Sequence, residues 1–253
     1  MAIKKKYTVL TYIFNGYEKV HEVREKDTEA DYVLVTDDQN LKSDTWTVIY
    51  EPFPGVSAFG KCYQVRFHPF RFANTPIVVR IDGSIEVRKS LKELVEKFEK
   101  GKYDRCLMIH PHRNLIPNEY DVWVKYRGYS VQQAGRCMKA MERMGYNLQS
   151  KGLIQGCFEI LNNSKKNDEL NDLVFGNLCL LATGGRIERI DQTITSFVLQ
   201  RFFPKMKLLL VSEDIITDGE LMQWYLHNSD KPIALKKDTI EPYLYDKPVK
   251  LWR

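Results

Sequence analysis

Charged side chains follow several apolar stretches of this sequence, at the points where those stretches end. Asp82 comes directly after the run Ile77–Ile81 and is itself followed by glycine. Asp37 and Asp38 follow a second run, and His110 follows a third. Ligands of open α/β sheets bind beyond the carboxyl ends of the strands, so a carboxylate there is well placed to hold a divalent metal. The alternative for Asp82 is a turn aspartate that bonds to its own backbone.

Alternating strands and helices are expected to position these residues. The β-branched run Ile77–Ile81 is typical of a strand covered on both faces, and Ile85–Val87 resumes an extended pattern. We expect further strands over 7–14, 31–36, 45–50, 103–109, 156–161 and 207–211, and helices over 58–67, 90–98 (with Ser90 and Glu93 forming a capping box), 131–144, 168–181, 190–202 and 220–227. This alternation predicts one layered α/β domain, with a helical cap from Val131 onward as the alternative. If the sheet is parallel, the polar strand ends meet at one edge.

The composition is that of an ordinary globular protein. Of the 253 residues, 43% are hydrophobic and 28% are charged, and the net charge of +5 suits an anionic substrate or membrane surface without requiring nucleic acid. No apolar segment approaches the length of a membrane span, no signal-peptide core is present, and the five cysteines are widely spaced. We therefore expect a reduced, cytoplasmic protein. The lack of a G-x-G-x-x-G after the first strand and of a P-loop motif disfavours those two nucleotide sites.

Five short motifs occur in a distinctive order along the chain. They are Tyr12–Tyr17 (YIFNGY), Val35–Asp38 (VTDD) followed by Ser43–Trp46 (SDTW), Arg80–Ser84 (RIDGS), His110–Arg113 (HPHR) followed by Glu119, and Glu188–Gln192 (ERIDQ). Their order resembles a family of glycosyltransferase-like domains from bacterial polysaccharide loci, which is related to plant Golgi proteins that act on cell-wall polymers. The family has an Arg-Asp-Gln step where this chain carries one inserted residue.

The resemblance implies a glycosyltransferase type A fold. This is a single Rossmann-like α/β domain over residues 1–253 with a mixed, mostly parallel central sheet, a nucleotide-binding half at about 1–113 and an acceptor-side half at about 114–253. It also implies a sugar-nucleotide donor, expected to be UDP-linked, and a divalent metal, Mn²⁺ or Mg²⁺, held by Asp82. The second acid of the family's D-x-D turn is Ser84 here, so Asp82 is the one metal ligand expected from that turn. His227 resembles the late metal-binding histidine of glycogenin-like transferases, and a polar helix end is its alternative.

The remaining candidate residues take roles from the same resemblance. The donor-binding candidates are Thr11 and Tyr12 at the base, Asp37 and Asp38 at the nucleoside, and Arg66, His110 and Arg113 at the diphosphate. A sugar hydroxyl or an acidic acceptor is the alternative partner of Arg113. Asp191 and Glu119 are the expected catalytic carboxylates on the acceptor side, where an inverting enzyme needs a general base. A helix N-cap is the alternative role for Asp191, and a surface loop position is the alternative for Glu119.

The expected function is a metal-assisted transfer of a sugar from a nucleotide-sugar donor to a glycan or lipid-linked acceptor in surface polysaccharide synthesis. A peripheral contact of the basic C-terminal residues with the inner membrane face is a further option, and no nucleic-acid partner is expected. Two other functions stay open. One is a catalytically inactive module that binds a sugar nucleotide or a glycan, and the other is a nucleotidyltransferase, which would share the sheet and the metal.

Overall fold

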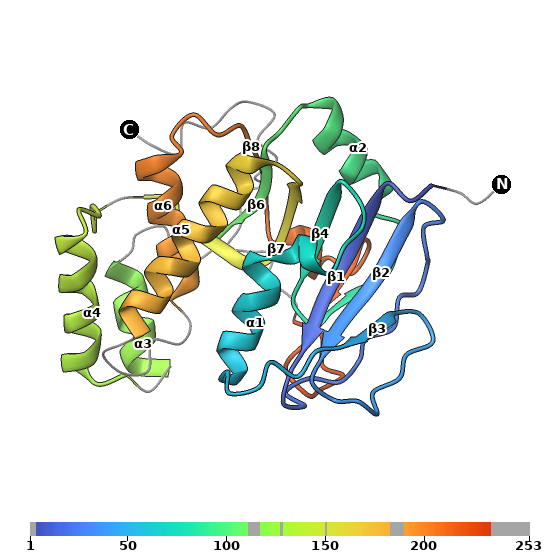
Figure 1. Cartoon of the computed structure of the whole chain (residues 1–253), viewed down its shortest axis with the longest axis horizontal. Coiled ribbons are helices and arrows are strands. Elements are labelled where there is room, and N and C mark those ends of the chain that lie inside the picture. The colour runs from blue at the N-terminus through green and yellow to red at the C-terminus, as the bar shows by residue number, and fades with distance from the viewer. Residues whose placement is uncertain (1–3, 111–116, 127–128, 150, 183–189, 234–253) are drawn as a thin grey trace.

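A seven-stranded sheet forms the centre of the computed structural model, which describes residues 4–110, 117–126, 129–149, 151–182 and 190–233 (Figure 1). The order of its strands is β3-β2-β1-β4-β7-β6-β8, and β5 and β9 form a separate two-stranded sheet. The strands are β1 (Tyr7–Ile13), β2 (Ala30–Thr36), β3 (Thr47–Tyr50), β4 (Ile77–Ile81), β5 (Ile85–Val87), β6 (Arg105–Ile109), β7 (Ile154–Asn162), β8 (Leu208–Val211) and β9 (Met222–Trp224).

The directions of the strands bring the polar strand ends to one edge of the sheet. Strands β1 to β4 run parallel, and β6 and β8 are also parallel to each other. Strand β7 is antiparallel to both of its neighbours, β4 and β6, so that β6 points the same way as β4. The fold is therefore α/β and Rossmann-like, with a mixed, mostly parallel sheet, as predicted. The carboxyl ends of β1, β2, β4 and β6 lie at the edge where β7 begins.

Helices cover both faces of the sheet because its strands are apolar on both sides. The helices are α1 (Ala58–Phe67), α2 (Lys92–Lys100), α3 (Pro117–Tyr126), α4 (Val131–Arg143), α5 (Lys165–Ala182), α6 (Asp191–Phe202) and α7 (Asp214–Thr217), with a 3₁₀ turn over Pro69–Arg71. Helices α3 to α6 gather at one end of the sheet, away from β2 and β3 (Figure 1). No helix in the described part of the chain is long and apolar enough to cross a membrane.

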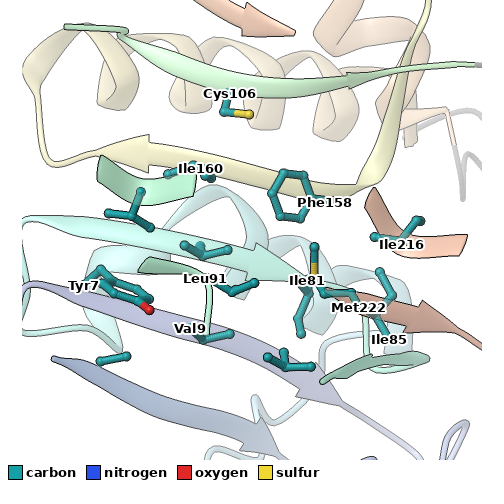
Figure 2. Close-up of a cluster of buried hydrophobic side chains, with 14 of the residues drawn as sticks. Tyr7, Val9, Ile81, Ile85, Leu91, Cys106, Phe158, Ile160, Ile216 and Met222 are labelled. Carbon is teal, nitrogen blue, oxygen red and sulfur yellow. The ribbon is translucent and has the colours of Figure 1, made fainter. Parts of the chain in front are cut away.

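The apolar side chains of β1 and β4 alternate between two buried clusters, one on each face of the sheet. On one face, Val9 of β1, Ile81 of β4 and Phe158 of β7 pack with residues from the small sheet, as Figure 2 shows. On the other face, Leu10 and Val78 pack with residues of α1. Successive side chains of a strand point to opposite faces, so neighbouring residues of one strand pack in different clusters.

Two sequence-based predictions of local structure are wrong. The segment 220–227 is not a helix, because Met222–Trp224 forms β9 and pairs with β5, which satisfies its backbone and buries Met222. The predicted capping box at Ser90 is absent, because α2 begins one residue later with Leu91 as its N-cap, and the Ser90 hydroxyl donates to Asp27. Helices α3 and α7 were not predicted.

Candidate functional site

Asp82 lies at the sheet edge, one residue beyond β4. Its backbone N–H donates to the Cys157 carbonyl of β7 at 2.9 Å. The Tyr12 hydroxyl and Arg80 Nη1 both donate to the carboxylate atom Oδ1, at 3.2 and 3.3 Å. Among the described residues, none donates a hydrogen bond to Oδ2. The side chain therefore does not cap its own turn, which excludes the alternative role, and within the described part of the chain its Oδ2 receives no hydrogen bond.

The surroundings of Asp82 disfavour its charged form in the absence of a ligand. Burial raises the pKa of the carboxyl above its ordinary value, although Arg80 and Arg66 act in the opposite direction. Asp191 raises the pKa further, which places this second carboxylate near Asp82. The Asp82 side chain nevertheless keeps 37% of its surface exposed. A cation at Oδ2 would stabilise the ionised form.

Arg80 connects Asp82 to a fully buried ion-pair network inside the sheet. Arg80 of β4 and Glu159 of β7 lie directly opposite each other in the antiparallel pair. Glu159 Oε1 accepts from Arg80 Nε at 2.6 Å, and Oε2 accepts from Arg105 Nε and Nη2 at 2.9 and 2.5 Å. Burial by itself would raise the pKa of Glu159, but Arg105 and Arg80 outweigh it and lower the pKa to about 2. Glu159 is therefore a charged partner of both arginines at neutral pH.

Asp191 is held next to this network by helix α1. It is the first residue of α6, and the N-cap of that helix is Ile190, so the Asp191 side chain does not cap the helix. Its Oδ2 pairs with Arg66 Nη1, and its Oδ1 accepts from the Tyr63 hydroxyl at 3.3 Å. The Arg66 guanidinium lies against Gly156 of β7, where an added Cβ would be 2.8 Å from Arg66 Cζ. The absence of a side chain at Gly156 thus lets Arg66 approach the sheet.

Ser84, the third residue of the D-x-D-like turn, is committed to packing. It is 1% exposed, and its hydroxyl accepts from Trp224 Nε1 at 3.2 Å. Its carbonyl accepts from the Tyr225 N–H at 3.0 Å. Ser84 therefore anchors the β9 segment to the turn that carries Asp82.

His227 packs on Tyr17, which connects it to the backbone of β1. The imidazole is 65% exposed, and its Nδ1 is 2.9 Å from Glu18 Oε2. Its ring packs edge to face on Tyr17, with 5.8 Å between the centroids. The Tyr17 hydroxyl in turn donates to the Tyr12 carbonyl at 3.3 Å. Since 220–227 is not helical, the helix-end alternative for His227 is wrong.

Asp37 and Asp38 have different environments at the end of β2. Asp37 Oδ1 accepts from the Asn15 N–H at 2.8 Å, and Oδ2 accepts from Lys61 Nζ at 2.7 Å. Burial would raise the pKa of Asp37, but these donors outweigh it and lower the pKa. Asp38 is exposed, and its carboxylate accepts from the Asn40 N–H at 2.9 Å within a turn. Asp37 therefore ties the loops after β1 and β2 to α1.

The other predicted residues differ in their environment. Tyr12 reaches Asp82, whereas Thr11 is buried and points to the opposite face of β1. His110 is 8% exposed directly after β6, and Arg113 lies outside the described residues. Glu119 is 1% exposed in α3, so the surface-loop alternative for it is wrong.

The structure brings five charged or hydroxyl side chains together at the edge, namely Tyr12, Arg66, Arg80, Asp82 and Asp191. Sequence reasoning assigned no role to Arg80, and it missed Glu159 and Tyr63. A signal existed for two of these three residues, because a charge inside an apolar strand needs a buried partner. Which charges pair could not be deduced without the order of the strands.

The arrangement fits a divalent cation that is shared with a ligand. The described residues contain no group of three or more His, Cys, Asp or Glu side chains that could enclose a metal ion. Asp82 Oδ2 supplies one carboxylate oxygen, and Mg²⁺ is commonly bound by one or two carboxylates together with substrate phosphates and waters. The protein groups therefore suit a metal diphosphate better than a metal alone.

No protein-family model matches the chain, and no curated protein matches its sequence. The function is therefore inferred from the geometry of the site.

Proposed function

We propose that this chain is a nucleotide-sugar-dependent glycosyltransferase that uses Mn²⁺ or Mg²⁺ and transfers a sugar to a glycan or lipid-linked acceptor. The observation that carries the proposal is the Asp82 carboxylate at the end of the central strand β4, with Oδ1 fixed and with no donor to Oδ2 among the residues that the structure describes. The mixed, mostly parallel sheet supports it, since a type A glycosyltransferase has such a sheet.

The charges around Asp82 favour a metal as the partner of the leaving diphosphate. Arg66 is paired with Asp191, and Arg80 is paired with Glu159 and Asp82, so neither arginine carries an uncompensated charge. Mn²⁺ or Mg²⁺ at Asp82 Oδ2 would supply the positive charge that stabilises the diphosphate as it departs. Arg113 stays a candidate for a further cation.

Asp191 is the proposed carboxylate on the acceptor side. Arg66 and Tyr63 fix it from α1, and it shares the environment of Asp82. In an inverting reaction it would accept the proton of the acceptor hydroxyl, and in a retaining reaction it would stabilise the positively charged sugar. For either role, the Asp191 carboxylate would have to leave Arg66 or bind the substrate while it stays paired with Arg66. A role for Glu119 in catalysis stays a prediction.

A binding module without transfer activity is the second candidate. Two contacts favour it. Ser84 stands where the family's turn has a second carboxylate and is bonded to Trp224, and the Asp191 carboxylate is already paired with Arg66. This module would bind the nucleotide diphosphate and metal but leave the donor intact. Donor hydrolysis therefore separates the two candidates.

The test of the proposal is the thermal stability of the protein with UDP, GDP or CDP, each with and without Mn²⁺. We expect a Mn²⁺-dependent rise in Tm with one nucleotide, lost in Asp82→Asn and retained in Ser84→Ala. Ser84 is the matched control because it belongs to the same turn as Asp82, but its side chain is buried and bonded to Trp224. The proposal fails if the wild type shows no shift with any nucleotide, or if Asp82→Asn retains the shift.

A further inference from the structure

We propose that Arg80 is a positioning residue that presents a single oxygen of Asp82 to the ligand. This inference rests on the proposed function of the Asp82 site. Arg80 precedes Asp82 by two residues, and side chains two apart in an extended chain lie on the same face. Arg80 is 0% exposed, so its position is set entirely by the protein around it.

The Arg80 guanidinium is fixed by strand β7 before it reaches Asp82. Nε donates to Glu159 Oε1 and Nη2 donates to the Gly156 carbonyl, each at 2.6 Å. A guanidinium is planar, so two anchored nitrogens also determine the direction of the third. Nη1 is therefore held at the sheet edge, where it donates to Asp82 Oδ1 at 3.3 Å.

Tyr12 completes the control of the same carboxylate oxygen. Its hydroxyl donates to Asp82 Oδ1 at 3.2 Å from strand β1, on the other side of β4 from β7. Two donors on Oδ1 oppose rotation of the carboxylate and leave Oδ2 for the ligand. We therefore infer that Asp82 binds through one oxygen, whereas a freely rotating carboxylate could present either oxygen or both.

Arg105 provides a matched control for Arg80. Both arginines are fully buried, and both donate to Glu159. The third nitrogen differs, because Arg105 Nη1 donates to Asn171 Oδ1 of α5 at 2.9 Å rather than to Asp82. Replacing either arginine by lysine keeps the charge and removes the planar set of donors. Both variants thus lose hydrogen bonds to Glu159, but only Arg80→Lys also changes the hydrogen bond to Asp82.

The experiment is a calorimetric titration of UDP, GDP and CDP with Mn²⁺ into wild type, Arg80→Lys and Arg105→Lys, with Tm measured in parallel. We expect both variants to lose thermal stability. Arg80→Lys should weaken binding of the metal nucleotide about tenfold or more, as is usual when a group that orients a metal ligand is lost. Arg105→Lys should bind within about threefold of wild type.

Equal weakening in both variants, or no weakening in Arg80→Lys, would overturn the positioning role while the proposed function stands. Absence of binding to the wild type would instead overturn the proposed function, and this inference with it.

A milder variant keeps the inference testable if Arg80→Lys does not fold. Tyr12→Phe removes one donor to Oδ1 and keeps the ring that stacks on Phe14. We expect it to fold and to bind the metal nucleotide several-fold more weakly. Tyr7→Phe is its control, because the Tyr7 hydroxyl donates to Asp27 instead. If the two variants bind the metal nucleotide with equal affinity, the hydrogen bonds to Asp82 Oδ1 do not contribute to binding.

Discussion

Two carboxylates share Arg80 and differ in nearly every other respect. Glu159 lies inside the sheet, receives three hydrogen bonds from two arginines, and has its pKa lowered to about 2. Asp82 lies at the end of β4, receives two bonds on one oxygen, keeps 37% of its side chain exposed, and has a raised pKa. Glu159, which is hydrogen-bonded on both oxygens, is suited to hold the sheet together, whereas Asp82, which is bonded on one oxygen, is suited to bind a ligand.

The largest expected effect on stability concerns Glu159. Glu159→Gln removes the charged partner of the buried Arg105 and the shorter of the two ion pairs of Arg80, so it should lower the free energy of unfolding by about 3–5 kcal/mol. Urea denaturation measures this change. The control is Glu96→Gln, which removes an exposed pair with Lys100 and should cost less than about 1 kcal/mol. Similar losses in the two variants would contradict the structural role of the network.

The pH dependence of stability should also report on Glu159. Its pKa is lowered from 4.5 to about 2 on folding, so its contribution is complete above about pH 4.5 and is lost as the pH falls toward 2. The difference in unfolding free energy between wild type and Glu159→Gln should therefore shrink over this window by roughly 3 kcal/mol. A difference that stays constant from pH 6 to pH 2.5 would show that the ion pairs contribute little.

A smaller effect is expected where the two regions meet, at Gly156. An added methyl group would displace the Arg66 guanidinium and disturb its pair with Asp191. We expect Gly156→Ala to lower the unfolding free energy by about 1–3 kcal/mol. Gly135→Ala in α4 is the control, because no atom beyond its chain neighbours and the backbone of its own helix lies within 4 Å of the added carbon, and it should be neutral or stabilising. Calorimetric unfolding of both variants distinguishes a local clash from a general effect of removing glycine.

The smallest change in stability is expected at Asp82, although this substitution should abolish binding. Its raised pKa means that ionisation is disfavoured in the folded state, so the penalty is present above the folded pKa and disappears at low pH. Asp82→Asn should therefore unfold within about 1 kcal/mol of wild type at neutral pH, with any difference in favour of the variant. Equilibrium unfolding at pH 7 and pH 4 checks the sign. A large loss of stability would place Asp82 with Glu159 as a structural carboxylate.

Local sequence patterns specified much of the scaffold. The bounds of β4, β5 and α1 match their predictions, because an apolar β-branched run and a capped helical spacing are local properties. The predictions for the other strands of the large sheet lie within two residues of the observed ends. The position of Asp82 at the end of a central strand also followed from the point where the apolar run stops.

Three-dimensional neighbours decided what the sequence pattern left open. The pairing of 222–224 with β5 overrode a helical spacing, and the approach of α1 to Asp191 replaced a capping role with an ion pair. Both results depend on segments that are more than a hundred residues apart in the chain. Local spacing contains no information about such contacts.

The sequence by itself thus determined most strands of the large sheet, several of the helices and the strand-end position of Asp82, because these depend on short-range periodicity and turn residues. Only the tertiary structure placed β7 antiparallel between β4 and β6 and set Glu159 opposite Arg80. That placement determined which oxygen of Asp82 is held and which is free. The physical reason is that a buried charge requires a partner, but the identity of the partner is fixed by the order and register of the strands.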